Sequence, residues 1–194
     1  MLIKTHSGRE VLGPKDNRDY WLERKNHDLY RLTLAMSSAM FPLAKSAIDV
    51  GCYTSGLLVE MDWIEKRIAT DIQSGLIDNW KDVDEVDFIC QDAFNLNTDT
   101  LFDLVISNQT IEHLEQPEIF VNSLLSIGKG LIISTTLDTP HGLIPGHIQD
   151  PIDMEKFKSW FPVELDCWSI CYHPTNKKIG HIIAVIKNNH PNRK

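Results

Sequence analysis

The sequence predicts an α/β protein whose mostly parallel sheet has helices on both faces and ends in an antiparallel hairpin. Three observations predict this fold class. Short apolar runs alternate with helical segments from residue 46 onward, which is the pattern of βαβ units. The stretch 47–56, AIDVGCYTSG, combines a buried strand, a glycine turn and the start of a helix. Near the end, the linker HPTNKKIG joins two strand-like runs and is too short for a crossover helix.

The elements follow from the spacing of apolar residues along the chain. A long helix is expected from residue 16 to 40, and Pro42 closes it. Residues 1–45 are thus expected to form an N-terminal helical segment, and residues 46–194 the core of a single domain. Strands are expected at 46–50, 67–70, 86–90, 102–107, 130–135, 165–172 and 181–186, and helices at 54–63, 74–80, 117–127 and 154–161.

The size and charge of the chain limit the classes of protein. With 194 residues, 42% of them hydrophobic, one domain with a sizeable core is expected. The formal charge of -8 argues against a broad phosphate-binding face, so a nucleic-acid partner is not expected. No apolar run approaches the ~20 residues of a membrane span, and the first residues lack the apolar core of a signal peptide. We therefore expect a cytoplasmic protein without a membrane partner.

The four cysteines are expected to be buried free thiols. Cys52, Cys90, Cys167 and Cys171 match neither a zinc-ligand spacing nor a CxxC redox pair. The last two share one face of a strand, where their Cα atoms would lie roughly 13 Å apart, too far for a disulfide.

Three nucleotide-binding patterns can be compared with the turn at Gly51. The dinucleotide pattern GxGxxG fails because Cys52 and Tyr53 follow Gly51. The P-loop pattern fails because Leu57 stands where a lysine is required. The remaining pattern, Asp-Val-Gly-Cys-x-Thr-x-Gly, resembles motif I of the class I S-adenosylmethionine-dependent methyltransferases.

The resemblance continues along the chain at suitable intervals. Asp71 matches the acid at the end of the second strand, QDAF at 91–94 matches the acidic turn after the third, and FDLVISNQTIEHL at 102–114 matches the segment at the fourth. The chain thus resembles a small methyltransferase domain of type 11. The resemblance implies a Rossmann-like sheet of seven strands, with the closing hairpin as the sixth and seventh, and S-adenosylmethionine as the cofactor.

Each parallel strand delivers its last residues to the same crevice. The Asp71 carboxylate, with Ile72 beside it, can accept hydrogen bonds there from both ribose hydroxyls of the cofactor. The resemblance places the amino-acid end of the cofactor over Gly51, with Asp49 supporting the loop. It also places the methyl-donor end of the cofactor beside Asn108.

The third strand is expected to supply the adenine contacts. By resemblance, Asp92 faces the adenine amino group, Ala93 offers its backbone N–H to the ring, and Phe94 adds apolar contact. A structural role is the alternative, because Asp71, Asp92 and Asn108 could instead cap the helices that follow them.

The loop departs from the family pattern at Tyr53 and Ser55, where glycines are usual. Glycine permits positive φ and close backbone approach to a ligand. The Tyr53 ring either packs against the cofactor, as a binding residue, or crowds it, and Gly51 could be only a turn residue. A noncatalytic methyltransferase-like binding or regulatory protein is therefore the alternative function.

The acceptor side is expected in the loop after the fifth strand, which holds His141 and His147. A histidine there titrates near neutral pH and could take a proton from a hydroxyl, so these two are the candidate catalytic bases. Both could equally be surface or structural histidines, and His113 beside Glu112 is a weaker candidate. A metal site from His141, His147, Asp150 and Asp153 matches no known ligand spacing, so no metal is predicted.

We therefore expect methyl transfer from S-adenosylmethionine to a small-molecule acceptor, with a hydroxyl oxygen as the favoured nucleophile. The mixed aromatic and basic side chains of Tyr20, Trp21, Arg24 and Tyr30 could form an acceptor wall or simply pack on the sheet. A nucleic-acid or protein methyltransferase acting with a partner chain is less favoured, because SNQT stands where the DPPY-type tetrapeptide would be. The sequence indicates no oligomeric state.

Overall fold

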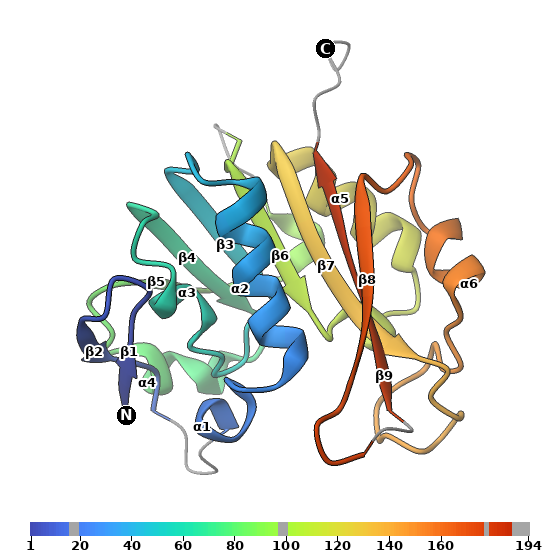
Figure 1. Ribbon diagram of the computed structural model, residues 1–194, viewed down its shortest axis with the longest axis horizontal. Helices are drawn as coiled ribbons and strands as arrows, with labels where there is room; N and C mark the ends of the chain where they lie inside the picture. Colours follow the sequence, from blue (N-terminus) through green and yellow to red (C-terminus); the bar gives the residue numbers. More distant parts are fainter. Residues whose placement is uncertain (16–19, 97–100, 177–178, 188–194) are drawn as a thin grey trace.

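The computed structural model of the chain describes residues 1–15, 20–96, 101–176 and 179–187. Nine strands, six α-helices and three short 3-10 helices lie in these ranges (Figure 1). The strands are β1 Leu2–Lys4, β2 Glu10–Leu12, β3 Ser46–Val50, β4 Lys66–Asp71, β5 Asp87–Cys90, β6 Leu104–Asn108, β7 Gly130–Leu137, β8 Cys167–Tyr172 and β9 Gly180–Lys187. The helices are α1 Tyr20–Arg24, α2 Asp28–Met40, α3 Leu57–Glu60, η1 Ser74–Leu76, α4 Ile77–Trp80, η2 Ala93–Asn95, η3 Ile111–His113, α5 Pro117–Ile127 and α6 Met154–Ser159.

The predicted seven-stranded sheet is confirmed. Its strand order is β5-β4-β3-β6-β7-β9-β8, with parallel pairing from β5 to β7. The strands β8 and β9 form the predicted antiparallel hairpin, and β9 inserts beside β7. Because β3 lies between β4 and β6, the chain order reverses there, and this switch point is where open α/β sheets bind ligands.

Helices cover both faces of the sheet, as predicted. Alternate residues of β6 belong to two separate core clusters, with Leu104 and Ile106 on one face and Val105 on the other. The first cluster packs under α2 and α3, while Phe120 of α5 and Phe157 of α6 fill the second (Figure 1). Within the described ranges, no helix is both long enough and apolar enough to cross a membrane.

The prediction of a continuous N-terminal helix is wrong in two respects. Residues 2–12 form the two-stranded β1–β2 sheet instead, and the described part of the 16–40 helix is split into α1 and α2. The rings of Trp21 and Tyr30 lie 5.1 Å apart. In one continuous helix, residues nine apart are separated by about 13.5 Å along the axis, so the contact requires the break. Residues 16–19 of the predicted helix lie outside the described ranges.

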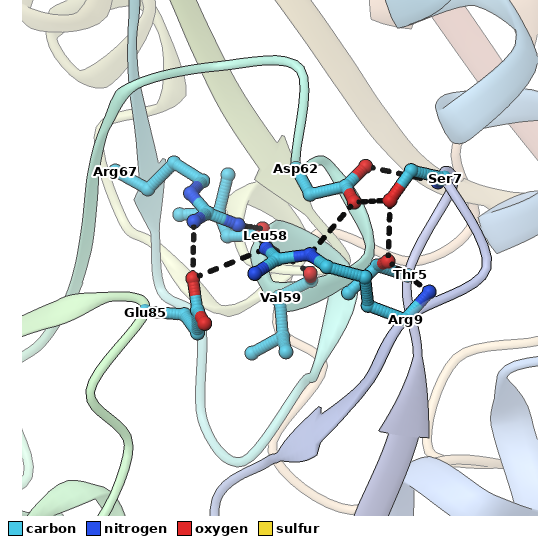
Figure 2. Close-up of polar contacts among 8 residues, drawn as sticks. All are labelled: Thr5, Ser7, Arg9, Leu58, Val59, Asp62, Arg67 and Glu85. Carbon is cyan, nitrogen blue, oxygen red and sulfur yellow. Dashed lines mark hydrogen bonds and ion pairs between the residues drawn. The ribbon is translucent and has the colours of Figure 1, made fainter.

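Polar contacts fasten the N-terminal hairpin to the edge of the domain (Figure 2). Ser7 N donates to Asp62 Oδ1 at 3.1 Å, and the Arg9 guanidinium lies 3.7 Å from Asp62 Oδ2 and 3.5 Å from Glu85 Oε2. The buried Arg67 of β4 meets the same Glu85 oxygen at 3.1 Å and donates to the carbonyl of Leu58 at 3.2 Å. These long-range contacts explain why the hairpin forms although its strands are only three residues long.

The cysteines are free, as predicted, but they are not all buried. Cys52 and Cys171 are buried, whereas Cys167 is half-buried and Cys90 is exposed. Cys90 is exposed because it ends the edge strand β5, whose side chains are mostly exposed.

Candidate functional site

A cavity of about 890 Å³ opens at the carboxyl ends of β3, β4, β5 and β6. Of the nine residues predicted to bind the cofactor, all except Asp49 line it: Gly51, Tyr53, Asp71, Ile72, Asp92, Ala93, Phe94 and Asn108. The sheet brings them together because parallel strands release their last residues at one edge.

The turn after β3 requires glycine at position 51. Gly51 has a φ of 77°, and a Cβ there would lie 2.2 Å from Thr110 Oγ1. Its backbone N–H and that of Cys52 both donate to the carbonyl of Thr70, at 2.9 and 3.1 Å. These bonds hold the turn against β4, and the backbone of Gly51 forms part of the cavity wall.

Tyr53 occupies the glycine position of the loop in a glycine-like conformation. Its φ is 47°, which is uncommon for a bulky residue. Three contacts hold it there. Its N–H donates to Asp71 Oδ2 at 3.0 Å, its carbonyl accepts from Trp80 Nε1 at 2.8 Å, and its ring lies 4.9 Å from that of Tyr20. Ser55, the other departure, accepts a 3.3 Å hydrogen bond from Leu57 N at the start of α3.

Asp71 is buried at the end of β4, and its carboxylate organises the loops on either side. Oδ2 accepts from Tyr53 N and Oδ1 accepts from Gln73 N, both at 3.0 Å. A carboxylate offers about four lone-pair positions, so two remain for a ligand. The exposed apolar side chain of Ile72 follows along the same wall.

Asp92 has the capping role that was the alternative to adenine binding. Its Oδ1 accepts from Phe94 N at 3.0 Å, which caps η2, and its Oδ2 accepts from Asn95 Nδ2 at 3.2 Å. Phe94 leans edge-on against Phe120, with 6.0 Å between ring centroids, and both rings line the cavity. Capping leaves lone pairs of Asp92 free, so it does not exclude ligand binding.

Asn108 is fixed by the core behind it. Its Oδ1 accepts hydrogen bonds from Ser134 Oγ at 2.8 Å and from Thr33 Oγ1 at 3.2 Å. Its Nδ2 is buried and has no hydrogen-bond partner among the described residues. An unsatisfied buried donor is costly, and a ligand acceptor in the cavity would satisfy it.

Asp49 lies beneath the loop rather than in the cavity wall. Burial, together with the nearby charge of Asp71, raises the pKa of Asp49 to about 7. The folded protein therefore holds a proton at Asp49 across a pH range in which the unfolded chain releases it.

Replacing Asp49 by asparagine should change how stability depends on pH. Because the folded state binds more protons than the unfolded state between about pH 4 and 7, the Asp49 contribution to stability falls as pH rises through this window. Wild type should therefore lose stability relative to Asp49→Asn from pH 4.5 to 7.5, as measured by urea unfolding. The control is Asp87→Asn, the same substitution at the exposed start of β5. Parallel curves for wild type and Asp49→Asn would contradict the shifted pKa.

The two predicted catalytic histidines lie in the loop after β7, as expected from the sequence, but outside the wall of the cavity. Neither His141 nor His147 belongs to the cavity lining, which instead includes His113. His141 is exposed and contacts the carbonyl of Asp150 at 3.3 Å. The ring of His147 lies behind that of His113, with 4.7 Å between centroids.

A buried polar network that the sequence did not predict surrounds His147. Its Nδ1 lies 2.8 Å from Asp150 Oδ2, and its Nε2 lies 4.0 Å from Oε1 of the fully buried Glu112. Burial lowers the pKa of His147, against the opposing effect of Asp150. Burial likewise raises the pKa of Glu112 to about 8. The only sequence signals were the adjacent letters EH at 112–113 and the acids near His147.

The strand order, the glycine turn after β3 and the acid at the end of β4 together define the class I methyltransferase fold. Residues 48–129 match the family described as a methyltransferase domain. No curated protein resembles the chain closely enough in sequence to count as a match.

Solved structures show the same fold over nearly the whole chain. The N-methyltransferase NodS from Bradyrhizobium japonicum WM9, in complex with S-adenosyl-L-homocysteine, aligns with a TM-score of 0.68 at 13% identity, covering 90% of this chain and 94% of that one. Magnesium protoporphyrin IX methyltransferase (ChlM) from Synechocystis PCC 6803, with the same molecule bound, gives 0.66 at 15% identity, covering 91% and 89%. The [4+2]-cyclase SpnF gives 0.61 at 14% identity, covering 80% of each chain.

The match of residues 48–129 to a methyltransferase domain, together with the shared fold, supports an S-adenosylmethionine-dependent methyltransferase with S-adenosylmethionine as its cofactor. The resemblance seen in the sequence and the predicted cofactor are thereby confirmed.

Proposed function

We propose that the protein transfers the methyl group of S-adenosylmethionine to a hydroxyl oxygen of a small-molecule acceptor. The observation that carries the proposal is the continuity of one cavity. It runs from Asp71 and Asp92 past Asn108 to His113, and Tyr20 and Arg24 of α1 also line it. One cavity thus offers a place for the cofactor and, next to it, a place for an acceptor.

The proposed cofactor position uses the groups that the strands present. The ribose hydroxyls donate to the free lone pairs of Asp71, and the adenine lies between Ile72 and Phe94, near Asp92 and Ala93. The amino-acid end follows the Gly51 turn, where Asp49 lies beneath the loop. The methyl-donor end then points toward Asn108, whose unpaired Nδ2 supports a polar contact with the ligand.

The reaction requires alignment more than activation, because the sulfonium already carries the reactivity. A lone pair of the acceptor oxygen forms the new O–CH₃ bond as the C–S bond breaks, and that bonding pair returns to sulfur. S-adenosylhomocysteine leaves, and the hydroxyl proton passes to a base. We propose that His113, which lines the cavity, contacts the acceptor. That His147 and His141 are catalytic residues stays a prediction. Because His147 lies behind His113, we propose that it orients the His113 ring.

The outer wall of the cavity offers an acceptor both charges, because Arg24 lies 3.6 Å from Glu23 and both residues line it. The Arg24 guanidinium lies 4.0 Å from the centroid of the Tyr20 ring, which fixes both side chains at the opening. Tyr20 and Tyr30 share a hydrogen bond of 3.1 Å between their hydroxyls. Burial raises the pKa of Tyr20, so this hydroxyl stays protonated and can contribute to a hydrogen bond.

A matched pair of compounds tests the choice of nucleophile. The purified chain should release S-adenosylhomocysteine from S-adenosylmethionine in the presence of 4-hydroxybenzoate or another hydroxylated aromatic acid. The amine counterpart, here 4-aminobenzoate, should give at least about tenfold less product. Faster turnover of the amine members of such pairs would overturn the assignment to oxygen. Binding of S-adenosylhomocysteine without turnover of any hydroxylated member would favour the noncatalytic alternative.

A further inference from the structure

Three side chains lie close together beside the cofactor cavity without a hydrogen bond between them. Glu112 and His113 belong to η3, while His147 comes from the loop after β7. One candidate ligand atom from each lies within 4.8 Å of the other two. Glu112 Oε1 and His147 Nε2 are 4.0 Å apart, which is too far for a hydrogen bond.

Both histidines are oriented so that a nitrogen lone pair is available. His147 Nδ1 lies 2.8 Å from a carboxylate oxygen of Asp150, and His113 Nδ1 lies 2.9 Å from the carbonyl of Gly146. Both of these oxygens accept hydrogen bonds, so each Nδ1 is the donor and carries the ring proton. Each Nε2 therefore keeps its lone pair. Histidines that bind metals in proteins are held in this way, with the second nitrogen donating to a carboxylate or carbonyl.

Glu112 gives an independent indication of a missing partner. Its side chain is fully buried, and Oε2 accepts a hydrogen bond of 3.1 Å from Thr135 Oγ1. Oε1 has no hydrogen-bond partner among the described residues. Leaving a buried carboxyl oxygen unpaired is costly, and a cation that replaces the Glu112 proton and lies between Oε1 and the two imidazoles would remove that cost.

Asp150, which accepts the hydrogen bond of His147, is itself held in place. Asp150 is buried, and its second oxygen, Oδ1, accepts a hydrogen bond of 2.9 Å from Thr136 Oγ1 on β7. The strand β7 thus fixes the orientation of the Asp150 carboxylate, and this carboxylate fixes the orientation of the His147 ring. Such preorganisation is what a metal centre needs from its surroundings.

We propose that Glu112, His113 and His147 bind a divalent transition-metal ion at the edge of the cofactor cavity. Two imidazole nitrogens and one carboxylate oxygen suit Zn²⁺, Mn²⁺ or Fe²⁺ better than Ca²⁺ or Mg²⁺, which prefer oxygen ligands. A tetrahedral ion with bonds of about 2.0–2.1 Å separates its ligands by about 3.4 Å, so binding draws the three atoms together. Because His113 lines the cavity, an open coordination position can face it.

The role of the ion rests on the proposed function. An ion at this edge would take the hydroxyl oxygen of the acceptor into its open position and lower the pKa of that hydroxyl. The proton then passes to water, and the oxygen keeps the electron pair that forms the bond to the methyl carbon. Binding of the ion itself does not depend on this role.

Titration of the chelator-treated full chain with Zn²⁺ or Mn²⁺ alone, by calorimetry, tests the site. Wild type should bind one equivalent of at least one of these ions. His113→Gln should weaken that binding by at least about 100-fold, and Asp150→Asn by about 10- to 100-fold. His113 is exposed, so its replacement leaves the buried core intact. The matched control is His173→Gln, a half-buried histidine between β8 and β9 and outside the cluster, which should bind as wild type does.

Two further readouts separate the inference from the proposed function. Co²⁺ should give a visible absorption band with wild type that His113→Gln lacks. S-adenosylhomocysteine should still bind the metal-free wild type, because the three ligands lie outside the ribose and adenine positions. Failure of wild type to bind either ion below about 1 mM, or equal binding by His113→Gln and His173→Gln, overturns the metal site. Loss of S-adenosylhomocysteine binding with metal binding retained overturns the proposed function alone.

Discussion

Replacing Asp71 by asparagine is expected to weaken the binding of S-adenosylhomocysteine by roughly tenfold to several hundredfold. Hydrogen bonds to a charged acceptor contribute roughly 1.5–3 kcal/mol each, and about 1.4 kcal/mol corresponds to a factor of ten. The asparagine amide also loses one of the hydrogen bonds that Asp71 makes within the protein. Asp71 accepts from the backbone N–H groups of Tyr53 and Gln73 through different oxygens, and one of them would face an NH₂ group. Calorimetric titration measures the affinity.

The control for Asp71→Asn is the same substitution at Asp87, the exposed first residue of the neighbouring strand β5. It removes an equal charge at the opposite end of the sheet and should leave the affinity unchanged. The melting temperature of each variant without ligand shows whether the loop has also weakened. Unchanged affinity in a folded Asp71→Asn variant would show that Asp71 only organises the loops, which was its alternative role.

Gly51→Ala is expected to cost roughly 2–5 kcal/mol of stability and to abolish cofactor binding. Two separate effects add. A φ of 77° is unfavourable for alanine by roughly 1–2 kcal/mol, and a methyl group placed 2.2 Å from Thr110 Oγ1 adds roughly 1–3 kcal/mol of overpacking. Urea unfolding measures the first consequence and calorimetry with S-adenosylhomocysteine the second.

Gly142 allows the two effects to be separated. It has the same φ of 77°, but nothing lies within 4 Å of the position that its Cβ would occupy. Gly142→Ala should therefore show only the backbone cost. The double variant Gly51→Ala/Thr110→Ala should recover part of the packing cost, because it removes the two nearest atoms. A Gly51→Ala variant no less stable than Gly142→Ala would refute the steric argument.

The alternation of strands and helices could be predicted because each element has a local signal. The strand β3 and the helix α5 have the predicted bounds, at 46–50 and 117–127. In the first, a short apolar run precedes a glycine turn, and in the second, proline stands at the first helical position. The same logic predicted that the candidate cofactor residues would lie together, since each lies at or shortly after the end of a strand.

Features that depend on distant residues could not be predicted in this way. Among the strand residues of the β1–β2 hairpin only Ile3 is buried, and the hairpin relies on Asp62 and Glu85, more than 50 positions away. The break between α1 and α2 brings Trp21 against Tyr30 and also against Gly56, which is 35 positions away. Likewise, His147 meets Glu112, 35 positions earlier, while the neighbouring His141 turns elsewhere. The spacing of residues along the chain does not predict such long-range contacts.

The first strand of the chain, β1, packs against the loop that lines the proposed cofactor site. The side chains of Ile3 and Trp21 occupy the space where a Cβ of Gly56, the last residue of the loop motif, would stand. Ile3 is in turn held by the hairpin that Asp62 and Glu85 fasten. Opening of the hairpin and loosening of the loop are therefore thermodynamically linked: a ligand that orders the loop also stabilises the docked N terminus. Cofactor binding at the ribose site is therefore expected to increase the protection of residues 2–12 from hydrogen exchange.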